Sequence, residues 1–152
     1  MLLKPCQRPR TGATVLECAV VLPVAVFLFI GLVVGTTGVF RYQETATLAR
    51  EGARYASTHG YQYRKDAGLS MGTPDEWRTD IYENGIKPKI VGLDAAALTV
   101  TVAWPDVVNQ KGKADNWPGS KVDVTVRYMW MPALYLVGPY YLESTSSMPI
   151  TN

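Results

Sequence analysis

The uncharged segment at residues 18–40 constrains this chain more than any other feature. It holds 23 residues without a single Asp, Glu, Lys or Arg. As an α-helix it would be roughly 35 Å long, and the hydrocarbon core of a bilayer is about 30 Å thick. Pro23 lies near its start, and membrane helices tolerate proline where neighbouring groups satisfy the freed carbonyl. The segment is longer than the apolar core of a secretory signal, so we expect a membrane helix that the mature protein keeps.

The charges that flank this segment predict its orientation. Lys4, Arg8 and Arg10 precede residue 13, and no acidic residue does. Because positively charged flanks tend to stay in the cytoplasm, we expect a cytoplasmic N-terminus and an extracytoplasmic C-terminal domain. Without residues 1–12 the chain keeps 12 of its 15 Lys and Arg against 13 Asp and Glu, a formal net charge of −1. No basic stripe remains, so nucleic acid is not an expected partner.

An acidic residue, Glu17, stands directly before the uncharged segment. A carboxylate at the start of a membrane helix is costly, which favours a functional role. The basic leader ends at Gly12, and the combination predicts cleavage between Gly12 and Ala13 in a pilin-like subunit that keeps its membrane helix. The new amine of Ala13 would be cationic. Glu17, one helical turn further, can pair with that amine or with the amine of a neighbouring subunit. A charge next to Cys18 does not suit a lipoprotein signal.

The helix is expected to continue beyond the membrane, from about residue 13 to about residue 58, and to end at His59 and Gly60. Small and apolar residues recur there at intervals of three and four, and charged residues lie on the opposite face. The small and apolar positions are Leu48, Ala49, Gly52, Ala53 and Ala56, and the charged ones are Glu44, Arg50, Glu51 and Arg54. Such a stripe predicts close packing by the chain's own sheet or by a neighbouring subunit, and the sheet is favoured for residues 49–56.

Gly31 and Gly35 form a second small-residue pattern, inside the uncharged segment. Two glycines four residues apart lie on one helix face and allow another helix to approach closely. They are candidates for helix packing in the membrane.

The remainder of the chain predicts a small α+β domain. Residues 60–74 are rich in glycine and are expected to form a loop, and a short helix should start at Pro74 and close at Asn84–Gly85. Strands are expected at residues 98–104, 121–128 and about 141–150, with a hairpin loop at residues 106–120. The simplest architecture is a three-stranded antiparallel meander packed on the C-terminal half of the long helix.

Residues 128–142 contain no charge and are rich in aromatic side chains. The stretch is too short and too interrupted by proline and glycine to cross a membrane. One interpretation is a loop that closes the core. The other is an exposed patch for a partner subunit or for the membrane interface. Its candidate residues are Trp130, Met131, Leu134, Tyr135 and Leu136.

The residue types that catalysis requires are not assembled in this sequence. His59 is the only histidine, and its place at a helix end suits a cap or a surface position. The acids Asp75, Glu76, Asp80 and Glu83 are expected to be solvated helix residues. No cysteine and histidine cluster has metal spacing, and no phosphate-binding loop is present. We therefore expect no enzyme activity, no metal, no cofactor and no small-molecule substrate.

Three segments together resemble the TadE-like family of minor pseudopilins from tight-adherence (Flp-type) pili. They read Gly-Ala-Thr-Val-Leu-Glu at residues 12–17, Val-Val-Leu-Pro at 20–23 and Ala-Arg-Glu-Gly-Ala-Arg-Tyr-Ala at 49–56. The resemblance implies a substrate of an aspartic prepilin peptidase in the bacterial inner membrane. Gly12 would then precede the cut, Ala13 would become the N-terminus, and Glu17 would be the fifth mature residue. Other pilin-type subunits and a pilus assembly platform are the implied partners.

The expected organisation is a leader at residues 1–12, a transmembrane helix at 13–40 and an extracytoplasmic pilin-like domain at 41–152. The favoured function is that of a membrane-anchored structural subunit in the assembly of a pilus or of a related secretion system. The alternative is an uncleaved, signal-anchored extracytoplasmic binding module. Cleavage at Gly12 distinguishes the two functions.

Overall fold

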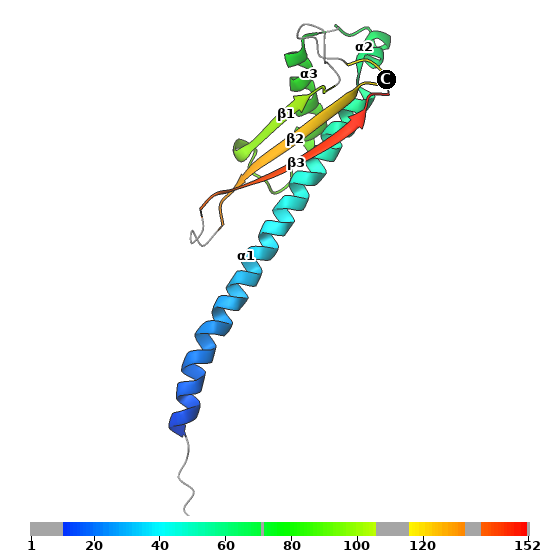
Figure 1. Ribbon diagram of the computed structural model, residues 1–152. Coiled ribbons are helices and arrows are strands. Elements are labelled where there is room, and N and C mark those ends of the chain that lie inside the picture. Colours follow the sequence, from blue (N-terminus) through cyan, green and yellow to red (C-terminus); the bar gives the residue numbers. More distant parts are fainter. Residues whose placement is uncertain (1–10, 71, 106–115, 133–137, 152) are drawn as a thin grey trace, which may run out of the picture. The chain divides into compact units, whose positions relative to one another are not determined.

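The computed structural model describes residues 11–70, 72–105, 116–132 and 138–151 (Figure 1). In chain order the elements are one long helix, a group of short helices and three strands. The chain divides into two compact units, and the boundary lies between Thr37 and Gly38. This boundary is close to the expected division after residue 40. The α+β class and the order of a long helix before a sheet are confirmed.

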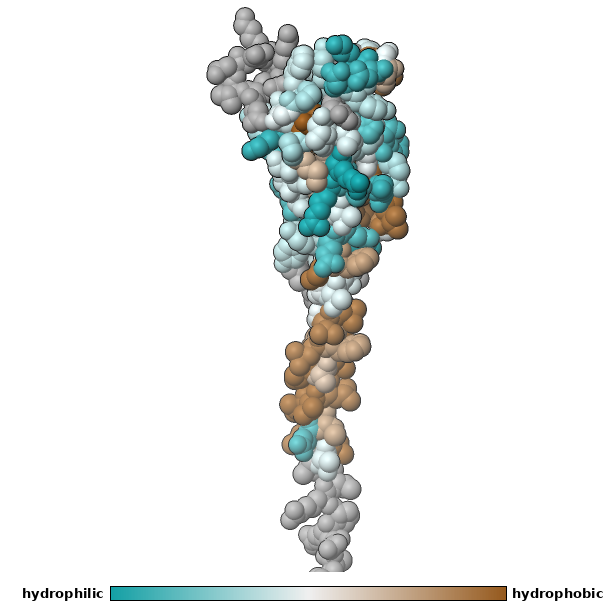
Figure 2. Space-filling model, turned by 90° about the vertical axis from the view of Figure 1, so that its right-hand side faces the viewer, coloured by the Kyte–Doolittle hydropathy of each residue, from teal (hydrophilic) through white to brown (hydrophobic). Residues whose placement is uncertain are grey.

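Helix α1 (Thr11–Thr58) is a single α-helix of 48 residues with Pro23 inside it. Its extent confirms the expected helix at residues 13–58. Almost all side chains of its uncharged part are exposed, and Figure 2 shows these apolar side chains in brown. This part is long and apolar enough to be a single membrane span.

The sheet consists of β1 (Leu98–Ala103), β2 (Lys121–Trp130) and β3 (Tyr140–Pro149) in the order β1-β2-β3. Both pairings are antiparallel, with Val100 opposite Val126 and Val126 opposite Ser144. The expected meander is therefore confirmed. Strand β2 is two residues longer than expected, and β3 is the less apolar edge strand.

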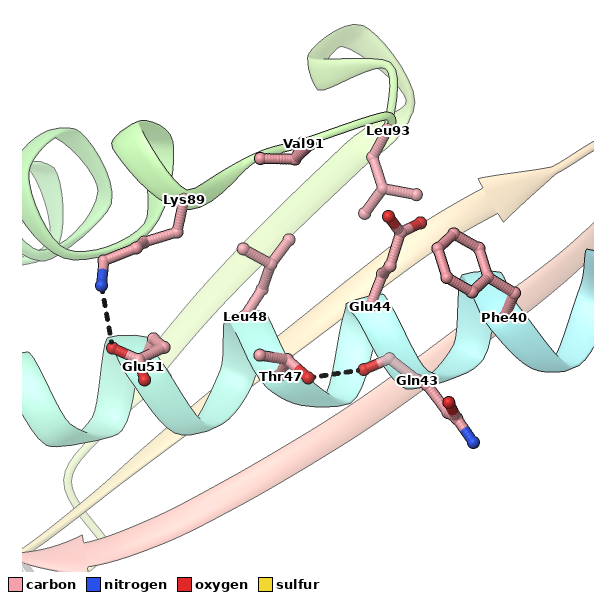
Figure 3. A pocket seen from close by; sticks show the side chains of 9 residues that line it. All are labelled: Phe40, Gln43, Glu44, Thr47, Leu48, Glu51, Lys89, Val91 and Leu93. Carbon is pink, nitrogen blue, oxygen red and sulfur yellow. Dashed lines mark hydrogen bonds and ion pairs between the residues drawn. The ribbon is translucent and has the colours of Figure 1, made fainter.

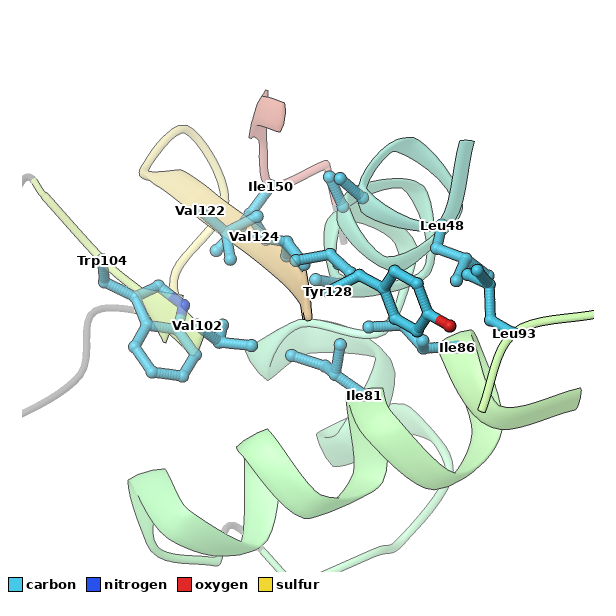
Figure 4. Packing of buried hydrophobic residues seen from close by; sticks show 14 residues of the cluster. Leu48, Ile81, Ile86, Leu93, Val102, Trp104, Val122, Val124, Tyr128 and Ile150 are labelled. Carbon is cyan, nitrogen blue, oxygen red and sulfur yellow. The ribbon is translucent and has the colours of Figure 1, made fainter. Parts of the chain in front are cut away.

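The hydrophobic core lies between the inner face of the sheet and the C-terminal half of α1 (Figure 4). Val122, Val124 and Val126 alternate along β2 and are fully buried. On α1 the small side chains Ala49 and Ala53 are also fully buried. Small helix residues let neighbouring side chains approach the helix backbone, so the sheet and α1 enclose a core to which Ile81 and Ile86 also contribute.

The short helix that begins at Pro74 extends further than the sequence indicates. Thr73 caps α3 (Pro74–Asp80) in a reciprocal capping box with Glu76. The chain then continues as a π-helical turn, η1 (Ile81–Ile86), and a 3-10 turn, η2 (Lys87–Lys89). The expected end at Asn84–Gly85 is thus wrong. Gly85 is buried, and a Cβ placed on it would lie 2.9 Å from Cβ of Tyr55. This glycine permits close packing on α1 and does not terminate a helix.

The segment at residues 60–74 was expected to be a loop, and this is wrong for its first part. It contains the helix α2 (Tyr61–Asp66), with Gly60 at its N-cap. Gly68, with φ of 67°, follows the helix end. The Tyr61 ring stacks on Trp117 with centroids 4.0 Å apart, and the Tyr61 amide donates to the carbonyl of Asn116. These contacts from a distant segment stabilise a helix that is too short to persist alone. A 3-10 turn, η3 (Ala95–Ala97), precedes β1. Residues 106–115 of the expected hairpin loop lie outside the described residues.

Candidate functional site

The residues of the expected cleavage and assembly site lie in the first turns of α1. Gly12, Ala13 and Glu17 are all helical, and both Gly12 and Glu17 are exposed. Ala13 and Glu17 are four residues apart, so they share one helix face. An amine at the nitrogen of Ala13 would lie one turn from the Glu17 carboxylate, which is the spacing that an ion pair requires.

Gly31 and Gly35 lie on an open helix face. A Cβ placed on either glycine meets no atom within 4 Å. Two polar side chains that follow are satisfied within the helix, because Thr36 donates to the carbonyl of Leu32 (2.8 Å) and Thr37 to that of Val33 (2.9 Å). This part of α1 therefore offers a flat, apolar strip with its hydroxyl groups already bonded, which suits lipid or another helix.

The stripe of small residues between Ala49 and Ala56 is enclosed by the chain itself. Ala49, Gly52, Ala53 and Ala56 are all buried. A Cβ on Gly52 would lie 2.8 Å from Cδ1 of Ile86. Of the two expected neighbours for this stripe, the chain's own domain occupies the place, so the stripe offers no surface to a second subunit.

Two residues of the candidate patch, Trp130 and Met131, lie where β2 ends. Trp130 is half-buried, and a Cβ on Gly38 of α1 would lie 3.0 Å from Cη2 and Cζ3 of its ring. Met131 is exposed. Leu134, Tyr135 and Leu136 lie outside the described residues. The contact with Gly38 was not foreseen, since a glycine in a helix does not reveal which distant side chain it accommodates.

A groove of about 430 Å³ runs between α1 and the segment before β1 (Figure 3). One side carries an ion pair between Lys89 and Glu51 at 3.4 Å. Near the other end, Arg41 pairs with Glu44 at 3.1 Å and also donates to the carbonyl of Gly92. The groove is lined by Phe40, Gln43, Glu44, Thr47, Leu48, Glu51, Lys89, Val91 and Leu93. Its charged groups are engaged in structural pairs, so the groove suits contact with apolar or mixed surfaces rather than chemistry.

His59 is held in an aromatic stack. Its Nδ1 lies 3.0 Å from the carbonyl oxygen of Tyr55, and the two rings stack with centroids 3.9 Å apart. The Tyr63 ring also contacts the imidazole, edge-to-face, with centroids 4.4 Å apart. Burial, and next the charge of Asp80, raise the pKa of the Tyr55 phenol. The Thr58 hydroxyl lies 2.9 Å from Nδ1 of His59 and also donates to the carbonyl of Tyr55 at 3.1 Å. These contacts hold the histidine at the end of α1.

The acids on and after α3 have structural partners. Asp80 pairs with Arg64 at 3.2 Å, and Asp75 pairs with Arg78 at 2.6 Å. Glu83 accepts a hydrogen bond from Lys87 at 2.6 Å, and this bond raises the pKa of the Lys87 ammonium. Within the described ranges, no group of three or more His, Cys, Asp or Glu side chains is placed to hold a metal ion.

Comparison of the chain with protein-family models, with curated proteins and with solved structures finds no match in any of the three.

Proposed function

We propose that this chain is a TadE-like pseudopilin, a membrane-anchored structural subunit in the assembly of a tight-adherence pilus or of a related secretion system. In this proposal a prepilin peptidase removes residues 1–12. Residues 13–40 then hold the subunit in the bacterial inner membrane, with the domain outside the cytoplasm. The proposal rests on the sequence motifs of α1 and on the contrast between its exposed N-terminal side chains and its buried C-terminal ones.

The division of burial along α1 is the observation that carries the proposal. Large apolar side chains between residues 15 and 40 are exposed, whereas Thr45, Ala49 and Ala53 are fully buried in the domain. An apolar strip this large is unfavourable in water, and lipid or other helices must cover it. One helix that provides both a lipid-facing segment and half of a domain core is the arrangement that a pilin-type subunit requires.

In this proposal Glu17 makes the association between membrane helices specific. Among side chains that face lipid, a carboxylate is stable only with a partner. The amine created at Ala13 is such a partner, in the same subunit or in the next one. Pairing between subunits would fix their register and would offset the cost of burying the carboxylate.

The test is the mass of the mature N-terminus, measured on chain isolated from its native membranes. A chain that begins at Ala13 supports the proposal, and a chain that begins at Met1 contradicts it. Glu17→Ala should leave α1 and the domain folded but prevent incorporation into a subunit complex. Gly31→Ala is the matched control for processing, because it alters the same helix away from the cleavage site. If Glu17→Ala leaves both processing and incorporation intact, the proposed role of Glu17 is wrong.

The second candidate function is an uncleaved, membrane-anchored binding module. The groove between α1 and the segment before β1 favours it, because a groove of about 430 Å³ with exposed Phe40 and Val91 can receive a partner's side chains. This function predicts a mature chain that begins at Met1. It also predicts a partner whose binding is lost with Val91→Asp.

A further inference from the structure

The end of the sheet at which β2 leaves and β3 begins carries exposed apolar and aromatic side chains beside Trp130, which itself packs against the core. Met131 is 52% exposed, Tyr140 49% and Tyr141 57%. Trp130 stands opposite Tyr140, and Met129 stands opposite Tyr141. The whole sequence between residues 128 and 142 is free of charge. We call the residues Met129, Trp130, Met131, Tyr140 and Tyr141 the hairpin end.

The contact between Trp130 and Gly38 fixes the level of the hairpin end along α1. The six-membered ring of Trp130 lies against the place where Gly38 lacks a side chain. If the uncharged segment is centred on the hydrocarbon core, the boundary falls about ten residues from its midpoint at residue 29. Gly38 then lies within roughly 1.5 Å of that boundary. With the segment centred in this way, Trp130 would lie where the hydrocarbon meets the headgroups.

Charged residues follow the contact between Trp130 and Gly38 both on α1 and on the sheet. On α1 the first charged residue is Arg41, three residues after Gly38 and about 4.5 Å further along the axis. On the sheet the first charged pair is Arg127 opposite Glu143, three residues and roughly 10 Å from Trp130. Two segments that are distant in sequence, the part of α1 before Arg41 and the hairpin end, are therefore both uncharged around the contact between Trp130 and Gly38.

The side chains at this level are those that a membrane interface favours. Tryptophan and tyrosine are enriched there because each joins an apolar ring to a polar group. The guanidinium of Arg127 lies 3.9 Å from the centroid of the Tyr141 ring. The charged group of Arg127 thus lies over the face of the Tyr141 ring, a cation–π arrangement that an interface rich in anionic headgroups accommodates.

We propose that the hairpin end inserts into the lipid–water interface of the membrane that holds α1. The domain would then be attached to the bilayer at two places, by α1 and by the hairpin end. The inference rests on the membrane-anchoring part of the proposed function. It adds a lipid contact for side chains of the sheet, and it does not depend on cleavage at Gly12.

The test uses the full chain in vesicles of phosphatidylcholine and phosphatidylglycerol. An environment-sensitive fluorophore is attached to a single cysteine at one of three exposed positions: Phe29→Cys, Met131→Cys or Ser147→Cys. The natural Cys6 and Cys18 are first replaced. Phosphatidylcholine with bromine on its acyl chains near the headgroup, or deeper in the chains, quenches the label where lipid touches it. Ser147 is the matched control, because it is exposed on β3 near the opposite end of the sheet.

We expect deep bromine to quench the label at position 29, shallow bromine to quench the label at position 131, and neither to quench the label at position 147. Tyr140→Cys provides a second label at the hairpin end, and circular dichroism establishes that each labelled chain is folded. A label at 131 that stays unquenched while the label at 29 is quenched overturns the inference. A blue-shifted but unquenched label at 131 also overturns it, because a protein partner then covers the hairpin end.

Failure of the anchor and failure of the inference give different results. An unquenched label at position 29 refutes membrane anchoring, and the inference falls with it. Quenching at both 29 and 131, in a chain whose mature N-terminus is Met1, supports the hairpin contact and contradicts only the pilin-type maturation.

Discussion

The substitution Gly52→Ala on α1 should improve helix propensity but overpack the core. Alanine is favoured over glycine in a helix interior by about 1 kcal/mol. The new Cβ, however, would lie 2.8 Å from Cδ1 and 2.9 Å from Cγ1 of Ile86, and 3.1 Å from Cγ1 of Val124. The first two distances are shorter than real Cβ contacts, so the neighbouring side chains must move.

The surroundings of Gly52 leave little room for such movement. Ile86 and Val124 are both 0% exposed, so neither can rotate into solvent. Overpacking of a core in which neighbours cannot relax costs about 1–3 kcal/mol. Subtracting the gain in helix propensity leaves a destabilisation between zero and about 2 kcal/mol, and we expect about 1 kcal/mol.

The assay is urea unfolding of the full chain in detergent, followed by near-ultraviolet circular dichroism of the domain's aromatic side chains. Gly35→Ala is the matched control, since it is the same change on the same helix with open space around it. In an Ile86→Ala background, Gly52→Ala should no longer destabilise, because the atoms that it meets most closely are gone. A Gly52→Ala chain that is about 1 kcal/mol more stable than the parent would refute the packing described for this site.

Three further changes test the domain by the same unfolding assay. The pKa of the Tyr55 phenol is raised in the folded chain, so the protonated phenol stabilises the fold fully below pH 10.0, the ordinary value. This stabilisation is lost as the pH rises through the folded-state pKa. Tyr55→Phe should therefore reduce the alkaline loss of stability. Arg64→Met removes the partner of Asp80 from an ion pair whose arginine is only 13% exposed, and it should cost about 1–2 kcal/mol. Ser57→Ala removes a hydrogen bond of 2.6 Å to the carbonyl of Pro149, and it should cost about 1 kcal/mol. Unchanged stability in either of the last two variants would show that the contact contributes nothing.

The elements that could be predicted from the sequence are those whose patterns are local. The long helix followed from the length of residues 18–40 and from the spacing of small residues after it. The strands β1 and β2 followed from alternation such as that of Val122, Val124 and Val126. In each case a period of two or of three to four residues identifies the buried face without knowledge of its partner.

The features that could not be predicted depend on contacts between distant residues. Gly85 was expected to end a helix, because the sequence does not show that Tyr55 lies against it. α2 was missed because its stability comes from Trp117 and Asn116. At the candidate site, the motif around Glu17 is visible in the sequence, whereas the level of Trp130 is not. The contact between Trp130 and Gly38 joins residues 92 positions apart, and no local pattern in the sequence reveals it.

The change of environment on α1 takes place within a few residues. The Thr45 side chain is fully buried and donates to the carbonyl of Arg41 (2.9 Å), while Arg41 itself bonds to Glu44 and to the carbonyl of Gly92. Between residues 38 and 58 the helix has no break. Within the domain, the Trp130 ring lies against Gly38 at the start of this helical stretch, and the buried side chains of Thr45, Ala49 and Ala53 follow within about four turns. The helix is therefore part of the domain from Gly38 onward, and its small side chains are what let the sheet pack against it.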